Sequence, residues 1–103
     1  MGGRGDDSQL DDLRRLYVDD LARYAAELDR ARDAGDRETI RLLTHRLVGT
    51  APSYGFDTVG ELARECEELL TAGAPLARLV SALERLTAAM RDPVRTDGAE
   101  PAP

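Results

Sequence analysis

The sequence predicts an all-α protein, folded as an antiparallel, up-and-down four-helix bundle. Alanine and leucine are plentiful while isoleucine, phenylalanine and valine are scarce, a composition that favours helices. Four segments carry apolar residues at steps of three and four, which is the period of an amphipathic helix. Short loops join these segments, and short loops place consecutive helices antiparallel.

The length of 103 residues corresponds to one domain, and we expect its helical part over residues 9–91. Residues 1–8 are rich in glycine and aspartate, and residues 92–103 are rich in proline, so we expect both ends to be disordered. The N-terminus lacks the apolar stretch of a secretory signal. No apolar run approaches the roughly 20 residues that span a bilayer, so no membrane association is expected.

The first helix is predicted to begin after Ser8, a candidate N-cap, and to end near Asp33. Its apolar stripe consists of Leu10, Leu13, Tyr17, Leu21, Tyr24 and Leu28. Gly35 suits the position just after the helix, and Asp36 can cap the second helix at once.

The second helix is predicted to carry a stripe of Ile40, Leu43, Leu47, Ala51 and Tyr54. Pro52 lacks an amide donor, so we expect it to bend this helix near its end. Gly55 and Phe56 then turn the chain.

The third helix is predicted to begin at a cap supplied by Asp57 or Thr58 and to stop at Gly73. Its stripe consists of Val59, Leu62, Cys66 and Leu69.

Pro75 fits the first turn of a fourth helix. The apolar residues of that helix are Leu76, Leu79, Val80, Leu83, Leu86 and Met90.

Charge and cysteine content exclude several classes of function. The net charge of −6 argues against nucleic-acid binding, which needs a basic face. All 14 basic residues are arginine, so any role that lysine usually fills falls to arginine or stays vacant. The single cysteine, Cys66, cannot form an internal disulfide, which fits the reducing cytoplasm where we expect the protein.

The only histidine, His45, is predicted to lie mid-helix on the side facing away from the apolar stripe. At about 100° per residue, it falls roughly 160° from the centre of the stripe of the second helix. Gly49 lies one turn above it, although glycine costs a helix about 1 kcal/mol relative to alanine. On an exposed face this glycine removes bulk beside the imidazole, so another protein could approach it closely.

Other interpretations of this histidine remain open. A lone surface histidine is most often only part of the surface, and a mid-helix glycine can equally let two helices pack closely. One histidine and one cysteine on different helices do not make a metal site. A small enzyme is disfavoured because the chain offers no convergent acid–base set and no second base to activate a nucleophile. It also lacks a phosphate-binding glycine loop.

The segment from Gly35 to Gly73 resembles a histidine-containing phosphotransfer (HPt) domain. Members of that family share a histidine followed by leucine, lysine, glycine, a small residue and alanine, with a glycine ten residues after the histidine. The matching residues of this chain are His45, Leu47, Gly49, Thr50, Ala51 and Gly55. The resemblance covers roughly 40 residues at the level of the motif.

The resemblance implies a bacterial phosphocarrier of a multistep two-component phosphorelay, a monomer without a kinase site of its own. His45 would accept a phosphoryl group from the aspartate of a response-regulator receiver domain and donate it to another. A hybrid histidine kinase is a further possible partner. The protein needs no cofactor of its own, because Mg²⁺ and carboxylates would come from the receiver domain. The alternative is a helical interaction module that docks a receiver or another signalling partner without carrying phosphate.

One departure from the family pattern concerns charge. The lysine usual three residues after the histidine is Val48 in this chain, and Arg41 or Arg46 could take its place beside the phosphoryl group. Glu67 lies where the family often places a polar side chain against the imidazole. A carboxylate there would accept the Nδ1–H bond and leave the other nitrogen as the nucleophile, but it would also repel a phosphate.

Recognition of the receiver is expected to rest on apolar residues around the histidine. The candidate docking residues are Leu42, Val48 and Pro52, rimmed by Arg41 and Arg46.

Overall fold

The computed structural model describes the backbone of residues 2–97, and the side chains of residue 9 and of residues 11–97. The elements are α1 (Gly2–Ala34), α2 (Arg37–Thr50), the 3₁₀ turn η1 (Pro52–Tyr54), α3 (Asp57–Thr71), α4 (Leu76–Arg91) and α5 (Pro93–Asp97). No strand occurs within residues 2–97, so the predicted all-α class is confirmed.

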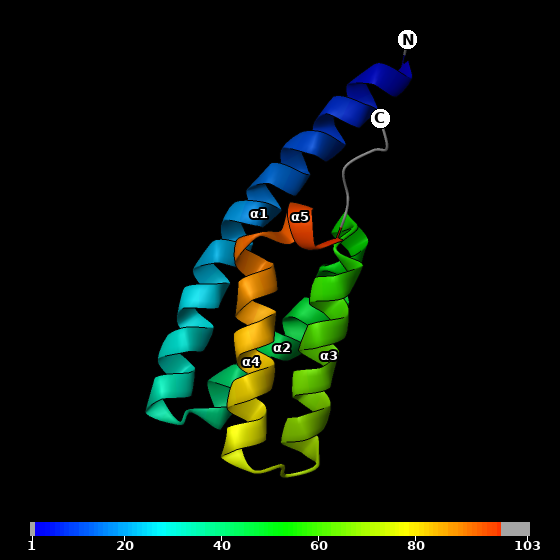
Figure 1. The fold of residues 1–103 in the computed structure, drawn as a ribbon. Coiled ribbons are helices and arrows are strands. Elements are labelled where there is room, and N and C mark those ends of the chain that lie inside the picture. The colour runs from blue at the N-terminus through cyan, green and yellow to red at the C-terminus, as the bar shows by residue number, and fades with distance from the viewer. Residues whose placement is uncertain (1, 98–103) are drawn as a thin grey trace.

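The four long helices pack side by side in a ring. Helix α1 contacts α2 and α4, and α3 contacts the same two helices from the other side. In Figure 1 each of these helices runs back along the one before it. Helix α2 therefore lies between α1 and α3, and side chains from both neighbours can reach its exposed face.

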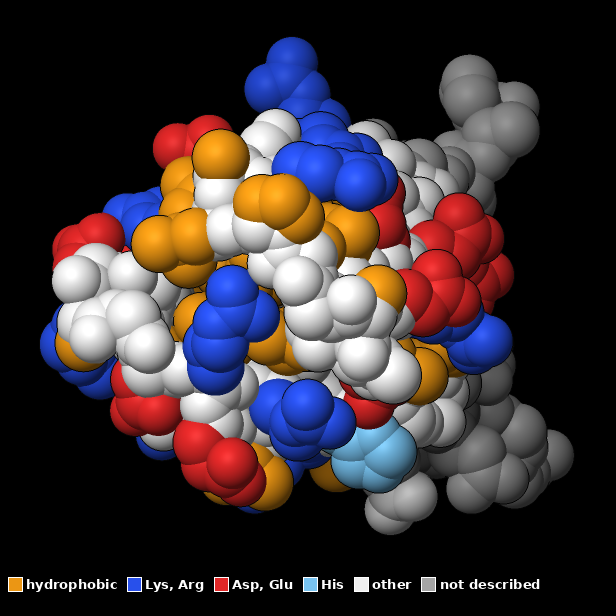
Figure 2. All heavy atoms as spheres, turned by 90° about the horizontal axis from the view of Figure 1, so that it is seen from below, with side chains coloured by type: hydrophobic (Ala, Val, Ile, Leu, Met, Phe, Trp, Pro, Cys, Tyr) orange, Lys and Arg blue, Asp and Glu red, His pale blue; other side chains and the backbone are white. Residues whose placement is uncertain are grey.

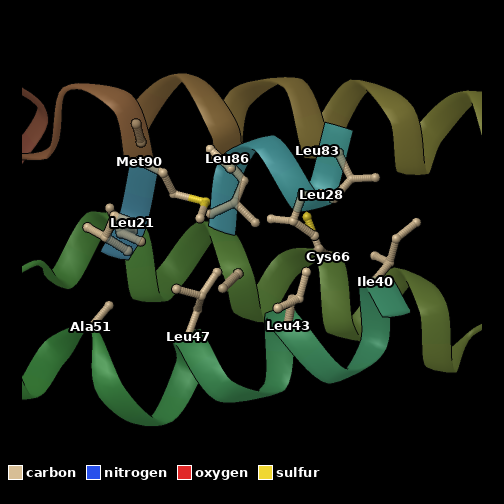
Figure 3. Packing of buried hydrophobic residues seen from close by; sticks show 14 of the residues in the cluster. Leu21, Leu28, Ile40, Leu43, Leu47, Ala51, Cys66, Leu83, Leu86 and Met90 are labelled. Carbon is tan, nitrogen blue, oxygen red and sulfur yellow. The ribbon is translucent and has the colours of Figure 1, made fainter. Parts of the chain in front are cut away.

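The core lies on the axis of this ring, and all four long helices contribute to it. Figure 3 shows Leu21 and Leu28 of α1 pointing toward Leu43 and Leu47 of α2. The largest fully buried side chains are Phe56, Leu21, Leu28, Ile40, Leu47, Leu79, Leu83, Leu86, Met90, Val59, Thr44 and Cys66. Most of them belong to the predicted stripes, because burying one apolar face per helix is the main source of stability in such a bundle.

Helix α1 is much longer than the sequence predicts. Residues 2–8, expected to be disordered, are helical, so the helix does not begin after Ser8 as predicted. The 33 residues of α1 span about 50 Å, roughly twice the length of any other helix. Figure 1 shows its first turns projecting beyond the bundle.

Because the first turns of α1 extend beyond the bundle, one residue of its predicted apolar stripe is exposed. Leu13 continues the stripe of Tyr17 and Tyr24, yet its side chain is 49% exposed, because α2 ends before it. The prediction that Leu13 belongs to the core was therefore wrong. Leu10, predicted on the same stripe, has a side chain outside the described residues.

Helix α2 ends at Thr50, one turn earlier than the sequence predicts. Pro52 has no amide hydrogen to donate to the carbonyl of Val48, so it starts the turn η1 instead of bending the helix. Gly55 then takes a left-handed conformation with φ of +88°, and the amide of Phe56 donates to the carbonyl of Ala51 at 3.0 Å. Tyr54 consequently lies in the turn, not on the helical stripe.

Aromatic residues tie this turn to α1. The rings of Tyr17 and Tyr54 stack with centroids 4.3 Å apart, and Phe56 lies on the same stack at 6.1 Å from Tyr17. The Tyr17 hydroxyl and the Thr50 hydroxyl share a hydrogen bond of 2.7 Å. Arg14 donates to the carbonyl of Tyr54 at 3.0 Å, so the C-terminal end of α2 is held in a defined position.

At its other end, α2 begins at a side-chain cap. Asp36 accepts hydrogen bonds from the amide and the hydroxyl of Thr39, as the sequence predicts for a capping residue. These bonds lower the pKa of the Asp36 carboxyl below its ordinary value. Gly35, with φ of +67°, ends α1 directly before it. Both ends of the histidine helix are therefore anchored.

The C-terminal segment also differs from the prediction. Residues 93–97, expected to be disordered, form the helix α5, and Pro93 is buried. Neither Asp57 nor Thr58 supplies the cap predicted for α3. Instead Asp97 of α5 accepts a hydrogen bond from the amide of Thr58 at 2.5 Å. A tertiary contact therefore satisfies a donor that the local sequence leaves free. Residues 98–103, also expected to be disordered, lie outside the described residues.

Within residues 2–97, none of the helices has both the length and the apolar character that crossing a membrane requires.

Candidate functional site

His45 lies on the outer face of α2, and its side chain is 78% exposed. Helical periodicity predicts this orientation, because Leu43 and Leu47 point into the core on the opposite side. In Figure 2 the imidazole, drawn in pale blue, protrudes at the edge of the molecule. An imidazole in this position is open to a large partner.

Glu67 of α3 holds one ring nitrogen of His45. The carboxylate oxygen Oε2 lies 2.6 Å from Nδ1, and the Glu67 side chain is only 27% exposed. A carboxylate can only accept, so in the neutral imidazole Nδ1 carries the proton and donates it. The lone pair then resides on Nε2, the nitrogen that no hydrogen bond occupies among the described residues.

Thr44, the residue before His45, is a buried polar residue of α2. Its side chain is fully buried, and its hydroxyl donates to the carbonyl of Ile40 at 2.9 Å. The sequence prediction missed this residue because threonine does not belong to an apolar stripe. The signal was available, however: a threonine inside a helix can satisfy its hydroxyl on the preceding turn and then be buried.

The exposed face of α2 has two unlike flanks, one on each side of His45. Since successive residues are rotated by about 100°, Arg41 and Val48 both fall within about 60° of His45 on one side. Leu42, Gly49 and Arg46 fall on the other side, all within about 100° of His45. We call the side with Leu42, Gly49 and Arg46 the α1 flank, and the side with Arg41 and Val48 the α3 flank. The names follow from Thr50, which lies further round in the same direction as Arg46 and contacts Tyr17 of α1.

The two arginines differ in their contacts. The guanidinium of Arg46 lies 5.5 Å from the centroid of the Tyr24 ring and donates to the Tyr24 hydroxyl at 3.3 Å. Arg46 is therefore held against α1. Arg41 is exposed and makes no side-chain hydrogen bond or ion pair to any residue whose side chain the structure describes. Only Arg41 lies on the same flank as Val48.

Gly49 and Leu42 leave the α1 flank open. A Cβ added to Gly49 would meet no atom within 4 Å, so this glycine packs against no neighbouring helix. Leu42 is 60% exposed and lies one turn from both His45 and Arg46. Together these residues offer an apolar surface with room for a partner to approach the imidazole.

Val48 and Pro52, the other predicted docking residues, differ in burial. Val48 is half-buried and packs against the core, so only part of it is available. Pro52 is exposed, and its ring also packs on Gly60 of α3: a Cβ at Gly60 would lie 2.8 Å from Cγ of Pro52. The sequence prediction missed Gly60, which permits this close approach.

Described residues form two shallow hollows, of about 290 and 200 Å³, and His45 lines neither of them. In the described part of the chain no three His, Cys, Asp or Glu side chains gather as a metal ion would require. An exposed nucleophile on a convex face suits a macromolecular partner better than a small substrate, which needs a concave site.

Comparison with protein families identifies one match. The family model of the Hpt domain matches residues 12–93, which is most of the chain and includes His45 and most or all of each long helix. The chain matches no curated protein and no solved structure.

Proposed function

Since the chain belongs to the Hpt domain family, whose members carry phosphoryl groups in phosphorelays, we propose that it is a histidine phosphotransfer protein of a multistep two-component phosphorelay. His45 accepts a phosphoryl group from the aspartate of one receiver domain and donates it to the aspartate of another. The observation that supports this most directly is the exposed imidazole whose Nδ1 is held by Glu67.

In the forward step, Nε2 of His45 attacks the phosphorus of an aspartyl phosphate in line with the bond that breaks. The new P–N bond forms as the P–O bond to the aspartate breaks, and the carboxylate leaves as an anion. The imidazole ring gains positive charge, and the nearby carboxylate of Glu67 stabilises it while keeping the proton on Nδ1. Transfer to the second receiver is the same step in reverse.

Phosphoryl transfer depends mainly on positioning and on charge neutralisation, so this domain can act without a pocket. A Mg²⁺ ion held by the receiver would supply positive charge at the phosphoryl group. The antiparallel four-helix bundle, with its α2 anchored at both ends, supplies a rigid support for His45.

We assign the remaining cationic role to Arg41. Val48 occupies the position of the family lysine, and Arg41 lies on the same flank of α2, one turn below His45. Arg46 lies on the opposite flank against Tyr24, which disfavours it as a substitute for the lysine. Receiver docking then rests on Leu42, Gly49 and the exposed part of Val48, with Pro52 at the end of the helix.

The test is phosphorylation of the purified chain by phosphorylated receiver domains of the same organism. We expect a single label on His45 that survives alkali and is lost in mild acid, as a phosphoramidate is. His45→Gln should abolish the label and leave the helical circular-dichroism signal unchanged. A label that persists in this variant would refute the assignment.

A second function, receiver docking without phosphate transfer, is favoured by one observation. Val48 removes the family cation while Glu67 adds a negative charge beside the imidazole. In that case His45→Gln should bind the receiver as tightly as the native chain, and neither protein should take up phosphate.

A further inference from the structure

The contacts of Arg46 suggest a role beyond the chemistry at His45. Arg46 is exposed, yet its guanidinium is fixed by both the ring and the hydroxyl of Tyr24. An unrestrained arginine samples many rotamers, and ordering it costs free energy when a partner binds. Stacking on an aromatic ring removes much of that cost before binding, and the cation stays accessible.

The neighbours of Arg46 are those expected of a protein interface. Leu42 lies one turn below Arg46 on the same flank and is 60% exposed, and Gly49 above it leaves open space. Interfaces typically combine an apolar centre with a charged rim in which arginine and tyrosine are enriched. The α1 flank shows this arrangement, and it is continuous with His45.

Charge indicates the kind of partner. The chain carries a net charge of −6, yet residues 41–49 of α2 contain two arginines and no acidic residue. This stretch of α2 is therefore more positive than the chain as a whole, although Glu67 of α3 lies beside His45, and its Arg46 complements a partner surface that carries carboxylates. The receiver domain of the proposed function is such a partner.

We infer that the receiver docks asymmetrically, across the α1 flank of His45, and places a carboxylate of its rim on the Arg46 guanidinium that Tyr24 of α1 holds in position. This inference rests on the proposed phosphotransfer function. It makes Tyr24 a positioning residue for docking and separates the two arginines: Arg46 recognises the partner, whereas Arg41 lies beside the phosphoryl group.

The experiment compares transfer from a purified phosphorylated receiver domain with labelling by phosphoramidate, a small donor that needs no docking surface. Arg46→Gln should lower the second-order rate constant for transfer from the receiver by about two- to five-fold at low salt, as for a rim charge. The maximal rate at saturating receiver and the rate with phosphoramidate should stay unchanged. At 1 M salt, where charges are screened beyond about 3 Å, the difference should disappear.

Two variants of Tyr24 and one control sharpen the result. Tyr24→Phe keeps the ring and should retain most of the native rate. Tyr24→Ala should slow transfer like Arg46→Gln, and the double variant should be no slower than the worse single one. Arg78→Gln is the matched control, because Arg78 is also exposed but lies on α4, across the ring from α2.

Several outcomes would overturn the inference. If Arg46→Gln behaves like Arg78→Gln, the receiver does not use Arg46. If Arg46→Gln slows phosphoramidate labelling as much as transfer, Arg46 acts at the phosphoryl group instead. If His45 is labelled by the receiver but neither variant changes the rate, only the docking inference fails. If neither donor labels His45, the proposed function fails with it.

Discussion

At the scale of single residues, two glycines occupy opposite environments. Gly49 faces open space on α2, whereas Gly60 on α3 lies under the ring of Pro52. Both are helical, so alanine would gain about 1 kcal/mol of helix propensity at either position. Whether a variant keeps that gain depends on the atoms that surround the added methyl group.

Gly49→Ala should raise the free energy of unfolding by up to about 1 kcal/mol, because the added methyl meets nothing. Gly60→Ala should lower it by about 1–3 kcal/mol, because its Cβ would press on a rigid proline ring 2.8 Å away. Urea denaturation of the two variants beside the native chain measures both effects. A destabilised Gly49→Ala would mean that this glycine serves packing and not access.

The cation near His45 yields a second prediction at this scale. Val48→Lys should speed phosphotransfer about two- to five-fold, since an exposed cation contributes roughly 0.5–1 kcal/mol and about 1.36 kcal/mol corresponds to a factor of ten. Val48→Met is the matched control, with a long stem but no charge. Arg41→Ala should slow transfer in the native background more than in the Val48→Lys background, because the two cations would serve the same phosphoryl group.

A double-mutant cycle on the rate of transfer from one phosphorylated receiver measures this coupling. Equal effects of Arg41→Ala in both backgrounds would show that Arg41 does not replace the lysine. Slower transfer by both Val48→Lys and Val48→Met would show that the apolar docking contact of Val48 outweighs any gain from a cation at this position.

At the scale of elements, the N-terminus of α3 depends on α5. Asp97 accepts the amide hydrogen of Thr58, and no side chain of α3 itself caps that end. A short C-terminal helix therefore supplies what a local Ser, Thr or Asp supplies in most helices. The start of α3 also contacts η1, where the ring of Pro52 lies against Gly60. The Asp97 cap therefore stabilises the part of α3 that supports Pro52, one of the candidate docking residues.

Asp97→Ala should lower the free energy of unfolding by about 1 kcal/mol, the usual cost of removing a helix cap. Asp97→Asn keeps an acceptor oxygen and should cost less. Glu84→Ala, at an exposed position of α4, serves as a control and should be close to neutral. Hydrogen exchange provides a second measurement, in which the amide of Thr58 should lose protection in Asp97→Ala. Unchanged stability and unchanged exchange would show that the Asp97 bond contributes nothing.

At the scale of the whole molecule, Cys66 reports on the integrity of the bundle. Its side chain is fully buried in the core that all four long helices form, and burial raises the pKa of the thiol to about 12. Since the thiolate is the reactive form, the fraction available at pH 8 falls from about one in ten at the ordinary pKa to about one in ten thousand.

We therefore expect Cys66 to react with a thiol reagent at pH 8 far more slowly in the native protein than in urea. Glutathione under both conditions controls for the effect of urea on the reagent. The folded thiol keeps its proton to a higher pH than the unfolded one, so stability should be unaffected by this group below pH 9 and should fall as the pH rises toward 12. Rapid native labelling would contradict a packed α3.

Much of the architecture follows from local patterns. Leu21, Leu28, Leu47 and Leu86 are all on predicted stripes and all buried, because a helix repeats every 3.6 residues whatever it packs against. The orientation of His45 follows from the same period. Where prediction failed, as at Leu13 and at the ends of α1 and α2, the outcome depended on contacts with neighbouring elements.

The sequence by itself determined the four long helices, their buried faces and an exposed histidine in a motif of the Hpt family. The resemblance to the family already implied Glu67 beside the imidazole, but only the tertiary structure decided the other contacts between helices. Tyr24 reaches Arg46 across 22 residues, and Asp97 reaches Thr58 across 39. Periodicity describes one helix at a time, whereas these contacts depend on the relative rotation and register of two helices. That rotation and register are set by how the whole core packs.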